Sequence, residues 1–162
     1  MFISWLDVFF KELFLLFKMH NVAIKIKYTV RCNLKCPYCS MNLPEGERAI
    51  FEELSVDQWL DLIDKFPFKI YKVILIGGEV FIRKDVIRFV NELTRRKIIV
   101  KILSNGTYLR MGELNPSPYL KLILTYHKDM VKLEHFLGLV KMLDEKHIQY
   151  KIYEVLGESE KK

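Results

Sequence analysis

The sequence predicts an α/β domain built on a parallel sheet of about five strands. From Asn21 onward, short apolar runs rich in β-branched residues alternate regularly with amphipathic helical segments. Strands that alternate with helices form βαβ units, whose right-handed crossovers make the strands parallel. The length of 162 residues fits one domain, and a hydrophobic fraction of 51% is ample for a packed core.

Five apolar runs predict the strands of this sheet. They are rich in β-branched residues, which favour the extended conformation. The predicted strands are residues 22–30, 71–76, 98–103, 120–126 and 148–155.

Three helices are predicted between these strands. Ser55 is the expected N-cap of the first, and Gln58, three positions on, completes a capping box. The segment 108–118 contains Asn-Pro and Ser-Pro steps that favour turns, so it holds a short helix at most. The helices are expected at residues 55–66, 84–96 and 131–146.

Residues 2–19 form the most apolar segment of the chain, and their polar residues recur at helical spacing. Asp7, Lys11 and Glu12 interrupt the apolar span, so we expect an amphipathic helix and not a transmembrane one. The segment lacks the basic start and small-residue cleavage site of a signal peptide. The helix is expected either to pack on the domain or to lie on a membrane surface or a partner.

The chain is therefore divided into an N-terminal amphipathic helix at 1–20, a core at 21–157 and a polar tail at 158–162. The net charge is +6, from 26 basic and 20 acidic residues. The basic residues are scattered along the sequence, which is typical of a solvated surface, and no nucleic-acid partner is expected. We expect a cytoplasmic protein, with peripheral membrane contact through residues 2–19 as the alternative.

Three cysteines lie within eight positions, at Cys32, Cys36 and Cys39. A disulfide would leave one of them over, whereas thiolates are the usual ligands of iron–sulfur clusters. A four-iron cluster held by three cysteines keeps one iron without a protein ligand, and an open position is what separates a catalytic metal site from a structural one. The alternative is zinc with a histidine as fourth ligand, but no histidine has finger-like spacing to these cysteines. The histidines are His20, His127, His135 and His147.

In this region the chain resembles the radical S-adenosylmethionine (radical SAM) enzymes. Their signature, Cys-x-x-x-Cys-x-aromatic-Cys after a first strand, is matched by Cys32, Cys36, Tyr38 and Cys39. The resemblance implies a [4Fe–4S] cluster on the three cysteines, with S-adenosylmethionine bound to the unique iron. It also implies one-electron cleavage of that cofactor to a 5′-deoxyadenosyl radical, which abstracts hydrogen from a substrate. An electron donor such as a flavodoxin or ferredoxin would be needed.

Two further motifs strengthen the resemblance. The family carries Gly-Gly-Glu-Pro after its second strand, and here Gly77-Gly78-Glu79 is followed by Val80 in place of proline. Ser104-Asn105-Gly106 matches an element that is common after the family's third strand. The resemblance covers about residues 22–155. Because parallel sheets bind ligands at the carboxyl ends of their strands, we expect all three motifs to meet at one rim.

The resemblance also implies roles for individual residues. Gly77 and Gly78 would let the cofactor approach the backbone closely, although they could instead form a turn. The Gly-Gly-Glu segment, Glu79 included, would bind the amino group of the methionine moiety, because a carboxylate or an exposed carbonyl suits an ammonium ion, although Glu79 could merely solvate a loop. We expect a bulky side chain at Gly78 to block the cofactor and to spare the cluster.

Other residues at the expected rim have less specific signals. By resemblance, Tyr38 would lie near the adenine, with plain packing as the alternative. Ser104 and Asn105 would contact the ribose, although they suit a turn equally well. His127 and Glu154 end the fourth and fifth predicted strands, and no motif fixes a role for either.

The family's usual core is a partial (β/α) barrel of six strands, and this chain offers about five with an added N-terminal amphipathic helix. We therefore expect either a compact member of the family or a shortened sequence. The open side of the barrel would be covered by that helix, a homo-oligomer or a protein substrate. The substrate class is open, with an activating enzyme for glycyl-radical proteins as the leading hypothesis. The competing hypothesis is a non-catalytic iron–sulfur or zinc module.

Overall fold

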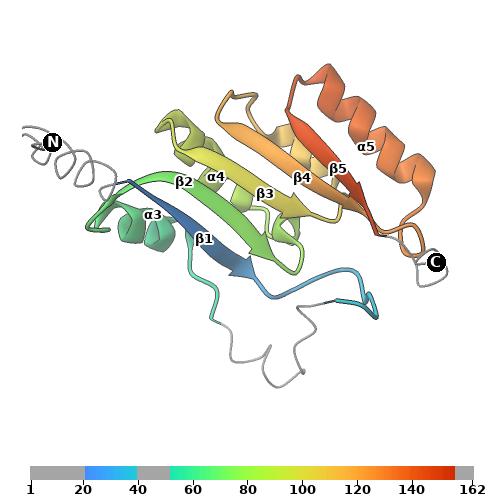
Figure 1. The fold of residues 1–162 in the computed structure, drawn as a ribbon, viewed down its shortest axis with the longest axis horizontal. Coiled ribbons are helices and arrows are strands. Elements are labelled where there is room, and N and C mark those ends of the chain that lie inside the picture. The colour runs from blue at the N-terminus through green and yellow to red at the C-terminus, as the bar shows by residue number, and fades with distance from the viewer. Residues whose placement is uncertain (1–20, 40–51, 156–162) are drawn as a thin grey trace, which may run out of the picture.

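The computed structural model describes residues 21–39 and 52–155 and contains one open sheet of five parallel strands (Figure 1). The strands follow one another across the sheet in chain order, and each pairs in parallel with the next. This confirms the α/β class and the partial, unclosed barrel that the sequence predicts. The strands are β1 (Asn21–Thr29), β2 (Lys69–Gly77), β3 (Ile99–Ser104), β4 (Leu120–Tyr126) and β5 (Tyr150–Glu154).

The three predicted helices are present and begin or end within a few residues of the expected positions. The Ser55 side chain accepts a hydrogen bond from Gln58 N, and the Gln58 side chain accepts one from Ser55 N, which confirms the capping box. Segment 108–118 contains only a short 3-10 helix, and a second 3-10 turn after β2 was not predicted. The helices are α3 (Val56–Asp64), η1 (Val80–Ile82), α4 (Val86–Arg95), η2 (Leu109–Glu113) and α5 (Leu133–Glu145).

The helices cover one face of the sheet. When strands lie in chain order and every crossover is right-handed, the connecting helices must lie on the same side. The strand residues that face them are buried, as the fully inaccessible Val73, Leu75, Val100 and Leu122 show. No helix among the described residues covers the opposite face, which we call the open face. Its residues alternate with the buried ones along β1, β2, β3 and β4, whereas β5 has no buried residue.

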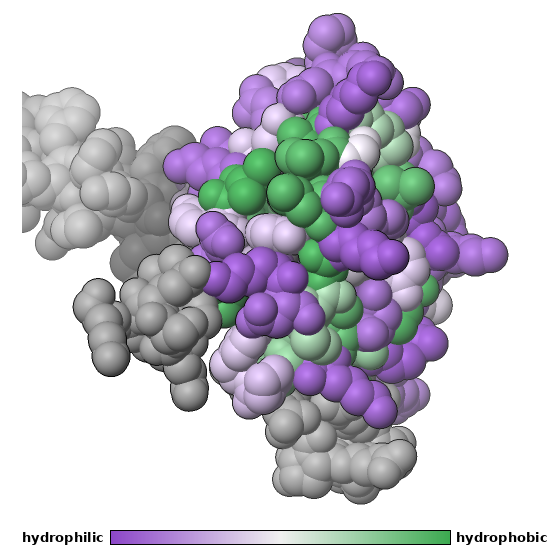
Figure 2. Space-filling model, turned by 90° about the vertical axis from the view of Figure 1, so that its right-hand side faces the viewer, coloured by the Kyte–Doolittle hydropathy of each residue, from purple (hydrophilic) through white to green (hydrophobic). Residues whose placement is uncertain are grey.

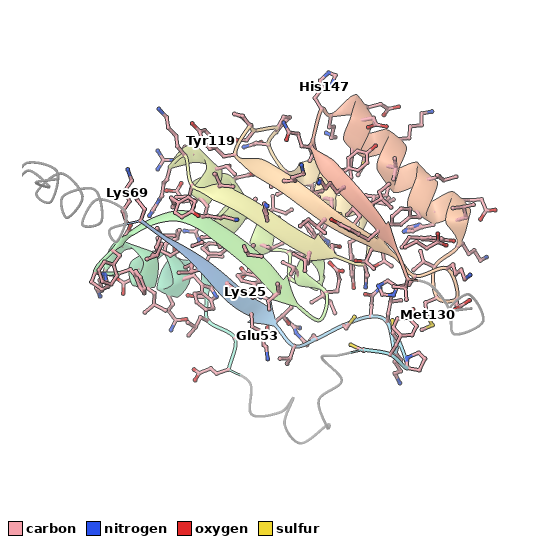
Figure 3. The ribbon with its side chains drawn as sticks, viewed as in Figure 1. Lys25, Glu53, Lys69, Tyr119, Met130 and His147 are labelled. Atoms are coloured by element: carbon pink, nitrogen blue, oxygen red, sulfur yellow. The ribbon has the colours of Figure 1, made fainter. Side chains whose placement is uncertain are left out.

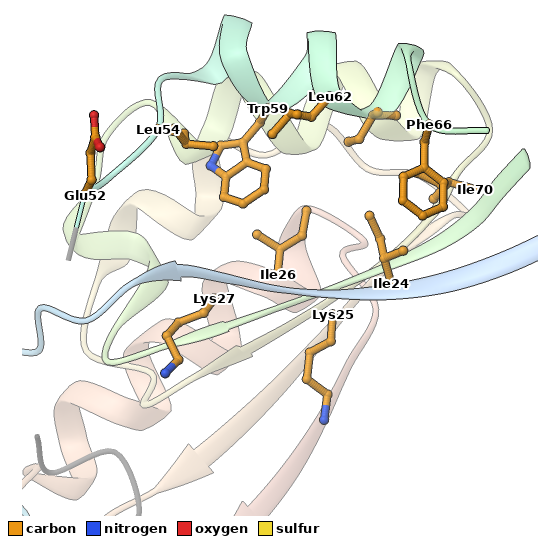
Figure 4. Close-up of a pocket in the computed structure, with 11 residues that line it drawn as sticks. Ile24, Lys25, Ile26, Lys27, Glu52, Leu54, Trp59, Leu62, Phe66 and Ile70 are labelled. Carbon is orange, nitrogen blue, oxygen red and sulfur yellow. The ribbon is translucent and has the colours of Figure 1, made fainter. Parts of the chain in front are cut away.

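The first strand shows this alternation directly (Figure 4). Ile24 and Ile26 point toward α3, where they line an apolar groove with Trp59 and other apolar residues of that helix. Lys25 and Lys27 point the other way, onto the open face. The two faces of β1 therefore have opposite chemistry.

The side of the molecule formed by α5 and β5 carries apolar residues among hydrophilic ones (Figure 2). Leu133 and Leu137 of α5 and Ile152 of β5 are all about half exposed. β5 is an edge strand, because it pairs only with β4 in the described sheet. That a homo-oligomer or a protein substrate covers the open side of the barrel remains a prediction.

The predicted N-terminal helix at 1–20 and the predicted polar tail at 158–162 lie outside the described residues, and so do residues 40–51 and 156–157 of the predicted core. Within the parts of the chain that the structure describes, no helix is long and apolar enough to cross a membrane.

Candidate functional site

The first two motifs meet where β1 and β2 end. Gly78 N donates a hydrogen bond to Thr29 O at 3.0 Å, and Glu79 N donates one to Arg31 O at 2.8 Å. Arg31 directly precedes Cys32, so the Gly-Gly-Glu segment pairs with the chain as it enters the cysteine loop.

The two glycines of the second motif are required by this close pairing. A Cβ on Gly77 would lie 2.2 Å from Thr29 O. A Cβ on Gly78 would lie 2.2 Å from Arg31 O and 2.9 Å from the Cβ of Cys32. The absent side chains therefore let the backbone of the second motif approach the first. Cofactor approach, the role expected from the resemblance, remains a separate prediction.

The Glu79 carboxylate joins the second motif to the third. Glu79 is completely buried, and its oxygens accept hydrogen bonds from Phe81 N at 2.9 Å and Asn105 N at 2.7 Å. The Ser104 hydroxyl lies 2.9 and 3.0 Å from the two oxygens. Burial raises the pKa of Glu79, and these donors oppose the shift. Its side chain therefore has a structural role that the sequence did not reveal, and its predicted contact with the cofactor amine stays a prediction.

The third motif in turn holds the cysteine loop. Asn105 Nδ2 donates to Asn33 Oδ1 at 3.0 Å and lies 3.8 Å from Cys32 Sγ. Asn33 Nδ2 donates to Thr107 Oγ1 at 2.9 Å. Gly106 has a φ of +70°, and a Cβ there would lie 2.5 Å from the ring of Phe136, so glycine is needed at this turn. All three motifs thus form one hydrogen-bonded unit at the rim.

An ionic cluster fixes the beginning of the cysteine loop. Glu53 lies beside the carboxyl end of β1 (Figure 3) and accepts hydrogen bonds from the Thr29 hydroxyl and from Arg31 Nη2, the latter at 2.7 Å. The Arg83 guanidinium lies 3.8 Å from the same carboxylate and 4.4 Å above the centre of the Tyr28 ring. These contacts lower the pKa of Glu53, although burial opposes the shift. Arg83 therefore stabilises the start of the cysteine loop through Glu53, which also binds Arg31.

The three cysteines are free thiols at different depths. Cys36 is buried, Cys32 is half-buried and Cys39 is exposed. Burial raises the pKa of the Cys32 thiol, against the effect of the Leu34 N–H that donates to it, and burial also raises the pKa of Cys36. Among the described residues, no three His, Cys, Asp or Glu side chains converge closely enough to hold a single metal ion. The irons of a cluster occupy separate corners, so its cysteine ligands lie farther apart than the ligands of one ion.

The structure brings His127 from the end of β4 to the cysteine loop. Its Nδ1 lies 3.6 Å from Cys36 Sγ and 3.1 Å from the Tyr38 hydroxyl, and its ring stacks on Tyr38 with a 3° interplanar angle. Burial lowers the pKa of His127, which favours the neutral ring. The sequence placed His127 at a strand end but could not assign it a partner, because no motif links it to Cys36.

The family model described as the radical SAM superfamily matches residues 26–147. The chain belongs to the radical SAM superfamily. The matched region contains all three motifs, which confirms the resemblance seen in the sequence. Val80, which stands where the superfamily's motif has proline, begins the 3-10 turn η1 and is fully buried.

Relatives of this radical SAM chain include two kinds of cyclase. A PqqA peptide cyclase of Granulibacter bethesdensis is 35% identical over 89 residues, which are 54% of this chain and 23% of the relative. A probable GTP 3′,8-cyclase of Methanopyrus kandleri is 33% identical over 88 residues, 54% of this chain and 27% of the relative. Streptococcus suis SuiB bound to S-adenosylmethionine, a solved structure, has a TM-score of 0.47 and 15% identity, with 88% of this chain and 40% of that chain covered. The chain spans about a quarter of the length of these two curated relatives.

The donor set at the rim fits the iron–sulfur cluster that the superfamily implies. Cys32, Cys36 and Cys39 could supply three sulfur ligands from one loop, and a four-iron cluster on them would keep an iron for the cofactor. Asn105 reaches toward the first of these sulfurs, and polar contacts near ligating sulfurs tune a cluster. Ser104 is buried and engaged with Glu79, so its predicted ribose contact and that of Asn105 remain predictions.

Replacing Glu79 by alanine is expected to destabilise the fold by about 3 kcal/mol or more. The change leaves two buried N–H groups and a hydroxyl without an acceptor, and each unsatisfied group costs about 1–3 kcal/mol. Urea unfolding at constant pH measures the loss, and the exposed Glu145→Ala on α5 is the matched control, expected within about 0.5 kcal/mol of wild type. Equal stability of the two variants would contradict the role assigned to Glu79.

Proposed function

We propose that this chain is the catalytic core of a radical SAM enzyme. The observation that supports this most strongly is the single hydrogen-bonded unit that joins the cysteine loop, Gly77-Gly78-Glu79 and Ser104-Asn105 at one rim. Cys32, Cys36 and Cys39 would hold the [4Fe–4S] cluster. When bound, the cluster would supply one electron for cleavage of S-adenosylmethionine to methionine and a 5′-deoxyadenosyl radical, which abstracts hydrogen from a substrate.

The residues of the rim would bind and orient the cofactor. Tyr38 is about half exposed and is held against His127, so its ring is available to an adenine. The backbone at Gly77 and Gly78 would receive the methionine amino group, while the buried Glu79 carboxylate keeps that backbone in place. Ser104 and Asn105 would border the ribose from the end of β3.

The names of the relatives suggest an enzyme that acts on a peptide or on a nucleotide. One relative is named for a peptide and another for a nucleotide, so both classes of substrate are candidates. The activating-enzyme subclass expected from the sequence remains a prediction. We also propose a flavodoxin or ferredoxin as electron donor, and a cytoplasmic location with membrane contact through residues 2–19 as the alternative.

A non-catalytic metal module is the second candidate, because His127 lies beside Cys36 and histidine is a common zinc ligand. In that case the rim would hold a metal without cleaving a cofactor. The two candidates differ in one product, 5′-deoxyadenosine.

Anaerobically reconstituted and reduced protein is expected to release 5′-deoxyadenosine slowly from S-adenosylmethionine, even without a substrate. The reason is that all the residues proposed to bind the cofactor belong to this chain and none to a substrate. Liquid chromatography of the reaction mixture measures the product, and protein from which the iron has been removed is the control. A protein with an intact four-iron cluster that releases no nucleoside would exclude the enzyme and leave the non-catalytic module.

A further inference from the structure

The open face of the sheet carries lysines from all five strands. The strand register places them together, because Lys101 pairs with Lys121 and because Ile74 pairs with both Lys25 and Lys101. Lys151 pairs with Ile123, which lies two residues beyond Lys121 on the same face. The lysines of this face include Lys25, Lys27, Lys72, Lys101, Lys121 and Lys151, and Lys69 lies at its far end, paired with Asn21.

The charge that the described strands place on this face has one sign. Within the described strands the only acidic residue is Glu154, and its register partner Tyr126 packs against Phe136 of α5. Glu154 therefore belongs to the helix side of the sheet. A solvated surface ordinarily mixes both signs, so the open face differs from simple solvation.

Two of these lysines are paired in a way that costs stability. Lys101 and Lys121 are direct register partners on neighbouring strands and both are half-buried. Like charges directly opposite each other in a sheet are destabilising. A bound anion would remove this cost, and a costly arrangement of this kind is typical of a binding site.

Four of the lysines form a compact group that we call the lysine cluster: Lys25, Lys72, Lys101 and Lys121. Neighbouring strands lie about 4.8 Å apart, so Lys101 and Lys121 are adjacent and Lys25 is about 10 Å from Lys101 across Ile74. Lys72 lies one side-chain row further from the rim. Lys101 precedes Ser104 by three residues, which places the cluster about 10 Å below the rim.

Apolar side chains separate the lysine cluster from the rim. Ile76, Leu103 and Ile123 lie in the next row of the open face, and Leu103 pairs with Ile123. Leu103 is 39% exposed, which is unusual for a leucine in an inner strand and leaves apolar surface for a ligand.

We propose that the open face binds a substrate that carries a phosphate or polyphosphate group. The lysine cluster would hold the phosphate oxygens, and the apolar row would hold the body of the substrate, with its reacting carbon toward the rim. The reaction at the rim rests on the function proposed above, whereas the binding of the anion does not. An extended acidic peptide fits less well, because β2, β3 and β4 are paired on both edges and have no backbone groups free for it.

Inorganic tripolyphosphate is the first probe, with calorimetric titration of the reconstituted protein. We expect Lys101→Gln combined with Lys121→Gln to weaken its binding at least about tenfold, because two charge-assisted contacts with the anion are lost. The control combines Lys84→Gln and Lys141→Gln, which remove the same charge from exposed positions outside the open face. It should bind like wild type. Thermal unfolding should show the first variant to be no less stable than the control.

Further probes identify the source of the phosphate and separate this proposal from the proposed function. A nucleoside triphosphate that binds more tightly than tripolyphosphate indicates a nucleotide, and equal binding indicates a free phosphate chain. Equal affinity in all three proteins, or a hexaglutamate peptide that binds wild type as tightly as tripolyphosphate, would overturn the proposal. Release of 5′-deoxyadenosine without substrate should be unchanged in the lysine variant, so its absence in wild type would count against the enzyme alone.

Discussion

Cys36→Ala is expected to abolish the cluster. Anaerobically reconstituted wild type should contain about four irons and four sulfides per chain, with a broad visible absorption. Removal of one of only three sulfur ligands should eliminate that absorption and the release of 5′-deoxyadenosine, and Cys32→Ala and Cys39→Ala should do the same. Iron and sulfide analysis together with the visible spectrum measures the effect.

His127→Ala is the matched variant for this experiment. Its Nδ1 lies near Cys36, so a zinc site that used it as fourth ligand would lose metal in this variant. A cluster held by the three cysteines should keep its iron. Stoichiometric zinc without sulfide in wild type, lost in both variants, would refute the cluster.

Gly78→Ala is expected to destabilise the protein by about 3 kcal/mol and to impair cluster assembly. The added methyl group would meet the backbone of Arg31 and the Cβ of Cys32, so the first ligand must move. This result would differ from the expectation drawn from the sequence, in which a side chain at Gly78 blocks the cofactor and spares the cluster. Urea unfolding and iron content measure the two effects.

Gly138→Ala on α5 is the control for that change. A Cβ at Gly138 has nothing within 4 Å, and alanine favours a helix over glycine by about 1 kcal/mol. We expect this variant to be as stable as wild type or more so, with full iron content. A Gly78→Ala protein that matched it in both measurements would show that β1 and β2 can separate at the rim without harm.

The sequence predicted the sheet because its strands are short apolar runs with turns and helices between them. It also predicted the common rim, since the three motifs end successive parallel strands. It could not predict the burial of Glu79, because a single acidic residue after a strand has no pattern that distinguishes a solvated loop from a buried acceptor. The contact between His127 and Cys36 joins residues 91 positions apart, and only the fold brings them together.

The common face of the strand lysines is a second feature that the sequence alone does not reveal. Along the chain these lysines are scattered, which is typical of a solvated surface. The period-two alternation of each strand sends them to one side, and the register then aligns Lys101 with Lys121. That register belongs to the pairing of β3 with β4, so the alignment of the two lysines emerges only from the assembled sheet.

The residues that hold the cysteine loop in place are translated after the loop itself. The three cysteines leave the ribosome before Asn105, Thr107 and His127, which contact the loop. In a nascent chain the cysteine loop therefore lacks some of its contacts until the residue that follows β4, His127, has been translated. Iron delivered during translation would meet loose thiols, whereas iron delivered after release would meet a loop already held in place.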